Sequence, residues 1–286
     1  FAALPTTLWA RAKRLPVVLE INGPLEDLFI AWPWTRKFRL LFEWMELWQM
    51  KIAEAIITVT PQLKEMVVSM LGSENVYVIP NGANTEVFSP TARISSPISQ
   101  PYVVFFGAMA PWQGIDTILA AADNPSWPSE VGVVFIGEGT EADAVRRAAR
   151  VNSRIKYMGV LPYRSVPSFV ANSIAGLSVQ SNVEGRAETG LYPLKVFETM
   201  ACGRPVIVSD WPGQSDLVRS SSCGVVVAPD DPSKLAEAVA YLASNPFIAS
   251  VLGSNGRKEV EERHSWKARA YQTHQVISSV IGLDLE

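Results

Sequence analysis

Short apolar runs rich in Val, Ile and Phe alternate with segments of helical pattern along most of the chain. In the second half these runs lie at residues 102–106, 131–136, 155–158, 174–179, 206–208 and 224–227. The first half carries similar runs at residues 16–21, 55–60 and 75–79. Strands that alternate with helices pack as parallel sheets with helices on both faces. The sequence therefore predicts an α/β fold of doubly wound parallel sheets.

The length and composition describe a globular protein without a nucleic-acid partner. The chain has 286 residues, of which 48% are hydrophobic, and this is enough for two domains of ordinary size or for one and a half. Its net charge of -3 argues against bulk nucleic-acid binding, which requires a basic face. No stretch reaches about 20 apolar residues without charge, so the sequence predicts no membrane-spanning helix.

The ends of the chain and its rare residues bear on where the protein works. The sequence begins at Phe1 and not at Met, so we expect an N-terminal piece to be missing, and a signal peptide stays an open alternative. Cys202 and Cys223 are too few for a disulfide framework or a metal cluster. We therefore expect a reducing compartment and a cytoplasmic protein. The two histidines, His264 and His274, are expected at the surface.

One polar loop and the helix that follows it carry the most specific chemical pattern. The loop ends at Gly190 and leads through Pro193 to an apolar helix predicted over residues 194–201. Proline suits the first position of a helix, because its missing N–H would have no partner there. The amides near Lys195 and Val196 are then free at the positive end of the helix dipole. Such a site favours an anion, and a diphosphate is the anion that we expect.

Glu198 lies about one turn beyond these amides. At that reach its carboxylate suits hydrogen bonds from vicinal hydroxyl groups, such as those of a ribose. The alternative is a surface carboxylate on an ordinary helix-to-strand connection. Its neighbours Phe197, Met200 and Ala201 weaken that alternative, because an apolar setting rarely leaves a carboxylate without a partner.

Residues 197–207, Phe-Glu-Thr-Met-Ala-Cys-Gly-Arg-Pro-Val-Ile, resemble the signature of the retaining glycosyltransferases of family 4, which have the GT-B fold. That signature is a Glu, seven residues, a second Glu and then Met-Ala-x-Gly-x-Pro-Val-Ile. The second half matches closely, but Gly190 stands in the place of the first Glu. Glu188 or Glu184 is the candidate replacement, and backbone amides are the alternative. The Pro-Leu-Lys before Phe-Glu resembles a subgroup of the family.

The resemblance covers roughly residues 55–270 and implies two Rossmann-like domains with a cleft between them. By this resemblance, residues 1–95 form the C-terminal part of an incomplete N-terminal, acceptor-side domain together with the hinge. Residues 96–262 form the domain that binds the nucleotide-sugar donor. Residues 263–286 form a C-terminal helix that crosses back to the first domain.

The loop that begins at Gly107 departs from the family pattern in its charges. Many members carry an Arg after this Gly and a Lys before the second Gly of the loop, and both serve the diphosphate. Here these places hold Ala108 and Gln113. The resemblance therefore shifts the binding of the diphosphate onto Lys195, the helix N-termini and Arg186.

A second loop is the candidate contact for the nucleobase. In the family, a Gly-x-x-Pro loop lies under the base, which bonds to backbone groups there. The matching loop here is residues 159–162. Val160 and Leu161 are thus candidate base contacts, and Tyr163 or Arg164 is the candidate to flank the ring. A plain strand-to-helix turn is the alternative.

Two features of the first half bear on the acceptor. Asn22 follows a predicted strand where relatives often carry a His, so it is a candidate for the acceptor side, or else a residue that ends the strand. Residues 32–53 combine large apolar side chains with Arg36, Lys37 and Arg39. This combination is typical of peripheral membrane contact on the inner face, which suits lipid-linked acceptors. A helix buried between protein layers is the alternative.

The resemblance implies a metal-independent retaining glycosyltransferase without a cofactor. Its donor is a UDP- or GDP-sugar and its acceptor a hydroxyl group of a glycan or lipid-linked sugar, in the synthesis of cell-surface polysaccharide or glycolipid. The candidate catalytic residues are Glu188, Lys195 and Glu198. The candidate donor-binding residues are Gly107, Gln113, Val160, Leu161, Gly190, Leu194, Val196, Phe197 and Glu198. A non-catalytic nucleotide-sugar-binding module and a GT-B sugar-nucleotide epimerase are the alternatives.

Overall fold

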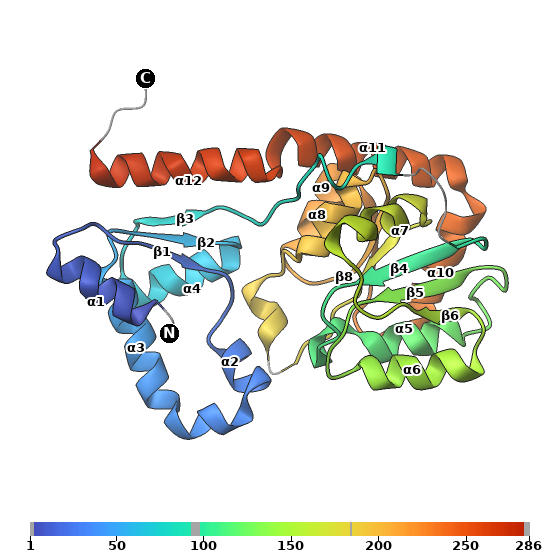
Figure 1. Cartoon of the computed structure of the whole chain (residues 1–286), viewed down its shortest axis with the longest axis horizontal. Coiled ribbons are helices and arrows are strands. Elements are labelled where there is room, and N and C mark those ends of the chain that lie inside the picture. Colours follow the sequence, from blue (N-terminus) through green and yellow to red (C-terminus); the bar gives the residue numbers. More distant parts are fainter. Residues whose placement is uncertain (1–2, 93–97, 184, 283–286) are drawn as a thin grey trace. The chain divides into compact units, whose positions relative to one another are not determined.

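The computed structural model describes residues 3–92, 98–183 and 185–282, and the chain divides into two compact units (Figure 1). The first unit comprises Phe1–Pro80, Glu184–Gly190 and Lys267–Glu286. The second unit comprises Asn81–Val183 and Leu191–Trp266. Each unit has its own sheet and its own hydrophobic core.

The first unit contains a three-stranded parallel sheet in the order β1-β2-β3. Its strands are β1 (Val18–Ile21), β2 (Ala55–Thr58) and β3 (Val76–Val78). The α-helices of this unit are α1 (Leu4–Ala12), α2 (Glu26–Ala31), α3 (Arg39–Ile52), α4 (Pro61–Leu71) and most of α12 (Trp266–Ile281). Two 3-10 helices, η1 (Pro33–Phe38) and η5 (Arg186–Thr189), complete it. The predicted strands of this half of the chain are confirmed.

Helices cover both faces of this sheet (Figure 1). On one face Ile56 packs with Leu63 and Val67 of α4. On the other face Ile57 packs with Val276 of α12. Successive side chains of a strand point to opposite faces, so neighbours in β2 serve different clusters.

Two predictions for this unit are wrong in part. We expected a buried strand at residues 16–21, yet within β1 only Ile21 is buried, and Glu20 is exposed. We also expected the aromatic helix to begin at Arg36. The α-helix begins at Arg39, because Phe38 has φ -115° and ψ 23° and interrupts the helical repeat after η1.

The second unit contains a six-stranded parallel sheet in the order β6-β5-β4-β7-β8-β9. Its strands are β4 (Tyr102–Phe106), β5 (Gly132–Ile136), β6 (Ile155–Tyr157), β7 (Gly176–Ser178), β8 (Val206–Ser209) and β9 (Gly224–Val227). Its α-helices are α5 (Ile115–Ala122), α6 (Ala142–Val151), α7 (Val166–Asn172), α8 (Leu194–Ala201), α9 (Gln214–Ser221), α10 (Pro232–Ser244) and α11 (Pro246–Arg263). Short 3-10 helices are η2 (Pro90–Ala92), η3 (Pro111–Gln113) and η4 (Tyr163–Ser165). The parallel α/β architecture predicted from the sequence is therefore confirmed.

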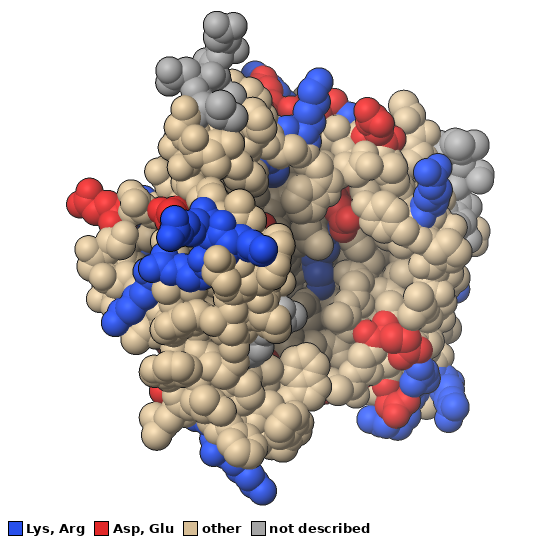
Figure 2. Space-filling view, turned by 60° about the vertical axis from the view of Figure 1, so that its left-hand side comes forward, with Lys and Arg blue, Asp and Glu red and all other residues tan. Residues whose placement is uncertain are grey.

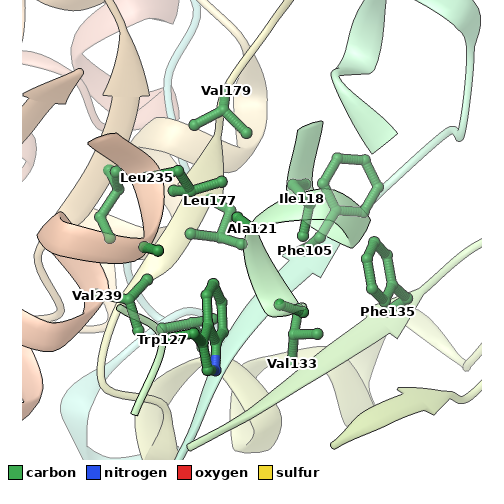
Figure 3. Packing of buried hydrophobic residues seen from close by; sticks show 14 of the residues in the cluster. Phe105, Ile118, Ala121, Trp127, Val133, Phe135, Leu177, Val179, Leu235 and Val239 are labelled. Carbon is green, nitrogen blue, oxygen red and sulfur yellow. The ribbon is translucent and has the colours of Figure 1, made fainter. Parts of the chain in front are cut away.

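The four central strands of the second unit, β5, β4, β7 and β8, are buried on both faces. Phe105 packs with Ile118 and Trp127 on one face, in the cluster of buried residues drawn in Figure 3. The next residue, Phe106, belongs to a second cluster on the opposite face, together with Phe197 of α8. Burying one such side chain stabilises the fold by about 1.5–3 kcal/mol. The core therefore holds α8 firmly against the sheet.

The order of the strands reverses at the centre of this sheet. From β4 the chain moves outward through β5 and β6, and it then returns to place β7 on the other side of β4. In open parallel sheets, ligands bind outside the carboxyl ends of the strands at such a switch point. The loops that follow β4 and β7 are therefore the expected location of a ligand site.

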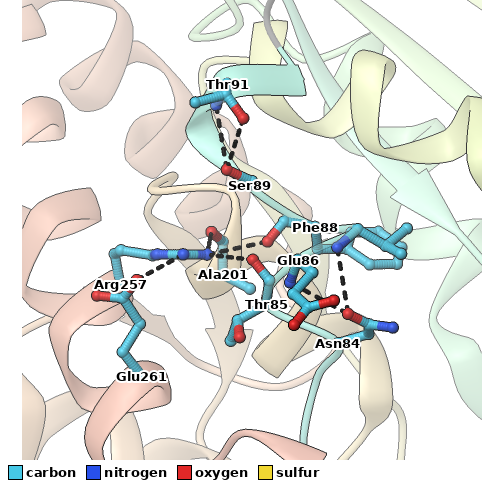
Figure 4. A network of polar contacts seen from close by, with 10 residues as sticks. Asn84, Thr85, Glu86, Phe88, Ser89, Thr91, Ala201, Arg257 and Glu261 are labelled. Carbon is cyan, nitrogen blue, oxygen red and sulfur yellow. Dashed lines mark hydrogen bonds and ion pairs between the residues drawn. The ribbon is translucent and has the colours of Figure 1, made fainter.

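A half-buried arginine fixes the far end of α8 (Figure 4). Nη1 of Arg257 donates hydrogen bonds to the carbonyl oxygens of Thr85, Phe88 and Ala201, at 3.2, 2.9 and 2.6 Å. Nη2 of the same side chain pairs with Glu261 at 2.5 Å. A cation that bonds the last carbonyls of a helix stabilises its C-terminus. Arg257 thereby ties α11 and the segment before β4 to α8.

His264 is not at the surface, and that prediction is wrong. Its side chain is buried and its ring lies 5.0 Å from the ring of Phe197. Its carbonyl oxygen accepts a hydrogen bond from the amide of Ala83. The residue stands where α11 ends and the chain turns into α12, so packing at this break determines its burial. His274 is exposed, as predicted.

On the face shown in Figure 2, lysine and arginine side chains stand in small groups, and most of the surface is uncharged. Large apolar side chains are exposed on η1, on α3 and at the residue before η1. They are Trp32, Trp34, Phe38, Leu40, Leu41 and Trp44. In the described residues no single helix has the length and apolar character needed to cross a membrane, and α10 with α11 meets that test only as a pair bent by 101°.

Candidate functional site

Three loops at the carboxyl edge of the second sheet are joined by backbone hydrogen bonds. We call residues 107–114, 137–141 and 158–162 the rim loops. The amide of Gly107 donates to Ile136, and the amide of Gly137 donates to Gly159 at 2.8 Å. These bonds continue the pairing of β4, β5 and β6 beyond the strands themselves. The rim loops therefore form one connected backbone layer.

Glycine is required where the rim loops approach one another. A Cβ on Gly137 would meet the carbonyl oxygen of Gly107, and a Cβ on Gly139 would meet the carbonyl oxygen of Met109, both far inside van der Waals contact. The two glycines also have φ of +129° and +155°, which side chains disfavour. The Gly-Glu-Gly segment thus fixes the position of the loop after β4.

The start of α8 differs from the prediction in one detail. Pro193 is the N-cap residue, with φ -65° and ψ 137°, and not the first helical residue. The amide of Val196 donates to the carbonyl of Pro193 at 3.0 Å, so it is not free as we expected. The helix therefore opens with the amides of Leu194 and Lys195. The side chains of Val196 and Phe197 are buried in the core.

Lys195 brings an amine to the loop after β4. Its side chain is buried, and Nζ donates to Oε1 of Gln113 at 2.6 Å. Nζ also lies 3.8 Å from the centroid of the Phe105 ring, a cation–π contact. Burial lowers the pKa of Lys195 to about 7, against the opposing charge of Glu198. Lys195 and Gln113, which were both predicted as site residues, thus meet at the switch point of the sheet.

Glu198 is half-buried one turn further along α8. The hydroxyl group of Tyr163 donates to its Oε1 over a long 3.5 Å, and the Tyr163 ring packs edge-on against Phe88 at 5.4 Å. Burial raises the pKa of Glu198 to about 7, although Tyr163 and the charge of Lys195 act in the opposite direction. Glu198 is therefore a half-buried carboxyl group whose pKa lies near neutral pH.

The candidate base contacts lie in the third rim loop. Val160 is largely exposed, and Leu161 is partly buried against the core cluster that contains Phe197. Arg164 is exposed beside them. Gly159 anchors this loop through its carbonyl oxygen, which accepts from Gly137.

A cluster of three polar side chains beside this loop was not predicted from the sequence. The hydroxyl group of Tyr157 donates to Glu138 at 2.5 Å, and Arg146 pairs with Glu138 and lies over the Tyr157 ring. These bonds, first that of Tyr157, hold the pKa of Glu138 below its ordinary value. The signal was the Glu between Gly137 and Gly139, which follows a buried strand at the carboxyl edge of the sheet.

The remaining predicted site residues belong to the first unit. Asn22 is exposed after β1, and Glu188 is exposed in η5. Gly190 has φ +79° and packs against Thr60, whose hydroxyl group donates to the carbonyl oxygen of Thr189 at 2.6 Å. Glu184 lies outside the described residues, as does the side chain of Arg186. No group of three or more His, Cys, Asp or Glu side chains that could hold a metal is found in the described part of the chain.

Comparison with known proteins identifies relatives over most of the chain. The family described as glycosyl transferases group 1 matches residues 100–245, and glycosyltransferase family 4 matches residues 1–87. A GDP-mannose-dependent phosphatidylinositol monomannoside mannosyltransferase of Corynebacterium glutamicum is 24% identical over 70% of this chain and 55% of its own length. An alpha-maltose-1-phosphate synthase of Mycolicibacterium smegmatis is 25% identical over 83% of this chain and 66% of its own length.

Solved structures agree with these relatives in fold. The Anabaena protein Alr3699/HepE, crystallised with UDP, superposes with a TM-score of 0.76 at 19% identity. The superposition covers 97% of this chain and 76% of the Anabaena chain. The present chain spans between about half and two thirds of the length of the two curated relatives named above.

Proposed function

The chain belongs to the group 1 glycosyltransferases and has the GT-B fold, and from this premise we propose that it transfers a sugar from a nucleoside diphosphate sugar to a hydroxyl group. The observation that carries the proposal is the buried amine of Lys195. It lies at the switch point of the second sheet, and no carboxylate of the described residues lies within ion-pair distance of it. A buried cation needs an anionic partner, and a diphosphate supplies one.

The second unit is the donor side in this proposal. The diphosphate lies against Lys195 and the first amides of α8, where the helix dipole and the amine act together. The ribose hydroxyl groups donate to Glu198. The base lies on the backbone of Val160 and Leu161, which the rim loops hold in place. The names of the relatives, one GDP-mannose-dependent and one crystallised with UDP, support a GDP- or UDP-sugar.

The chemistry that we propose retains the configuration of the sugar. The bond between the anomeric carbon and the diphosphate oxygen breaks, and a bond to the acceptor oxygen forms on the same face. The acceptor proton passes to the leaving phosphate oxygen. Lys195 and the helix dipole stabilise the charge that develops there. The acceptor is a glycan or a lipid-linked sugar, which the name of the phosphatidylinositol mannosyltransferase supports.

Transfer assays with a panel of UDP- and GDP-sugars test this function. We expect release of UDP or GDP with formation of a glycoside that has the anomeric configuration of the donor, measured by NMR. Glu198→Ala is expected to abolish the activity, whereas Glu237→Ala, which changes an exposed carboxylate on α10, leaves it intact. An inverted glycosidic linkage contradicts the retaining mechanism.

A binding module without turnover is the second candidate. Gly190 stands in the place of a carboxylate, and its surroundings are filled by Thr60 and Gln62 of its own unit. Binding of a nucleotide sugar without release of the free nucleotide, in the presence of glycan and lipid acceptors, would favour this candidate.

We also propose that residues 32–53 contact an anionic lipid surface on the cytoplasmic side. Trp34 and Trp44 are more than half exposed, with 62% and 61% of their surface accessible. Arg36 and Lys37 lie in η1, and Arg39 opens α3. Aromatic rings with nearby cations suit the interface of an anionic bilayer.

Vesicle flotation tests this contact. The protein is expected to float with vesicles that contain phosphatidylglycerol and less with pure phosphatidylcholine, and high salt should weaken the binding. Trp34→Ala with Trp44→Ala should remove most of it. Trp266→Ala, which changes an exposed tryptophan at the start of α12, is the control. Equal binding of all variants would contradict the proposal.

A further inference from the structure

Gln113 and Lys195 meet across 82 positions of sequence, at a point where no other described side chain bonds the amine. Gln113 ends η3, and Gly114 follows with φ +63°. A Cβ on Gly114 would overlap the carbonyl oxygen of Val179, in the segment after β7. The two loops at the switch point are therefore in backbone contact, and this contact fixes the backbone next to Gln113.

The surroundings of Lys195 use only part of the hydrogen-bonding capacity of its amine. Phe105 lies beneath it, and the Oε1 of Gln113 takes one N–H. Gly107 stands beside the amine, since a Cβ added there would lie 3.9 Å from Nζ of Lys195, and Gly107 itself is exposed. An ammonium group has three donors. Donors therefore remain for a ligand that approaches from the side of Gly107.

The acceptor that holds this amine is neutral. A carboxylate in the place of Gln113 would form an ion pair with Lys195 and cancel its charge. The amide oxygen bonds the amine equally well in geometry but adds no negative charge. Glu198 acts on Lys195 only through its charge, without a hydrogen bond between them in the described structure.

We propose that Gln113 is a positioning residue that holds Lys195 with a neutral acceptor and so keeps its charge available to the diphosphate of the donor. This inference rests on the proposed function for the identity of the anion. Gln113 acts through Lys195 and not by contact with the sugar. Replacing the side-chain amide of Gln113 by a carboxylate changes its charge but hardly its shape. This substitution therefore distinguishes the positioning role from a role in packing alone.

The test compares Gln113→Glu with Gln113→Ala in the full protein. Two quantities are measured: the pKa of Lys195 without ligand, from NMR of its labelled side chain, and the binding of UDP and GDP by calorimetry at pH 6.5. Gln275→Glu, which places the same charge at an exposed position of α12, is the control. Melting curves establish that each variant is folded.

The expected results differ for the two variants. Gln113→Glu raises the pKa of Lys195, because a carboxylate stabilises the ammonium form. The same variant weakens binding of UDP or GDP by about 10- to 100-fold, because its charge repels the phosphates. Gln113→Ala lowers the pKa of Lys195 and weakens binding less than the glutamate variant. The other charged and titratable groups that face Lys195 are Glu198 and, through it, Tyr163.

An unchanged pKa of Lys195 in Gln113→Glu would overturn the proposal, and so would binding of nucleotide as tight as in Gln113→Ala. Failure of the proposed function has a different signature. In that case neither UDP nor GDP binds the native protein, while the pKa of Lys195 still rises in Gln113→Glu. That outcome supports the contact between Gln113 and Lys195 and rejects the diphosphate as its ligand.

Discussion

The two sheets of this protein follow the same alternation of strand and helix but differ in how completely they are buried. In the second unit β4 and β5 are buried at every position, and glycines let their loops approach backbone to backbone. In the first unit β1 is largely half-buried or exposed, and η1 and α3 present large aromatic side chains to solvent. The buried core of the second unit therefore suits the precise positioning of a binding site. The exposed aromatic surface of the first unit suits contact with other molecules.

The largest effect is expected from Gly137→Ala. Its Cβ would overlap the carbonyl oxygen of Gly107, and its φ of +129° is strained for alanine. We expect a loss of about 3 kcal/mol or more in the free energy of unfolding, measured with urea. Gly72→Ala in the first unit is the control, since Gly72 has φ +64° and nothing lies within 4 Å of its Cβ position. That variant should lose only about 1 kcal/mol. Equal losses would remove the distinction between the units.

Lys195→Met separates binding from stability within the second unit. Loss of the buried cation should weaken binding of UDP or GDP by about 30-fold or more. The melting temperature should stay constant or rise, because an apolar side chain of similar volume replaces a desolvated amine. Calorimetry and thermal melting measure the two effects. Lys258→Met, at an exposed position of α11, controls for the change of net charge. Retained affinity in Lys195→Met would show that the amine does not serve a nucleotide.

A pH series on Glu198→Gln tests how far the burial of an ionised Glu198 destabilises the folded protein. The folded pKa of about 7 lies above the unfolded value of 4.5, so the folded protein binds the extra proton between these values. Glu198 thus reduces stability progressively as the pH rises from about 4.5 to 7. The variant should therefore gain stability relative to the native protein over this window, by about 3 kcal/mol at pH 8. Melting curves at pH 4.5 and 8 that show the same difference would contradict a raised pKa.

The smallest effect on stability is expected in the first unit. Trp34→Ala and Trp44→Ala should each change the free energy of unfolding by less than about 0.5 kcal/mol, since both rings are mostly exposed. Phe29→Ala, which truncates a buried ring in the same unit, should lose about 3–5 kcal/mol. Urea unfolding measures both. A large loss at Trp34 or Trp44 would mean that these rings belong to a packed core.

The sequence alone located α8 and its surroundings well. Alternating apolar runs predicted the strands on either side, and the helix spans residues 194–201 as predicted. These features depend on residues close to one another in the chain. The position of Pro193 was one place in error, because a proline fits both the N-cap and the first turn and packing decides between them.

The contents of the site depended on contacts that no local pattern encodes. Glu138 and Tyr157 lie 19 positions apart, and no motif of the sequence links them. The incomplete burial of β1 and the burial of His264 were not predicted, for the same reason. Burial depends on what packs against an element, and the element's own composition does not reveal it.

The sequence by itself determined the α/β class, the order of the strands along the chain and the helix that carries Lys195 and Glu198. Hydrophobic period and helix ends are local properties, so they can be read without the fold. Only the tertiary structure decided that β7 returns beside β4, that Gln113 reaches Lys195, and that two glycines let the rim loops touch. Such contacts join residues far apart in the chain, and the chemistry of a buried amine depends on them because burial removes the water that would otherwise solvate its charge.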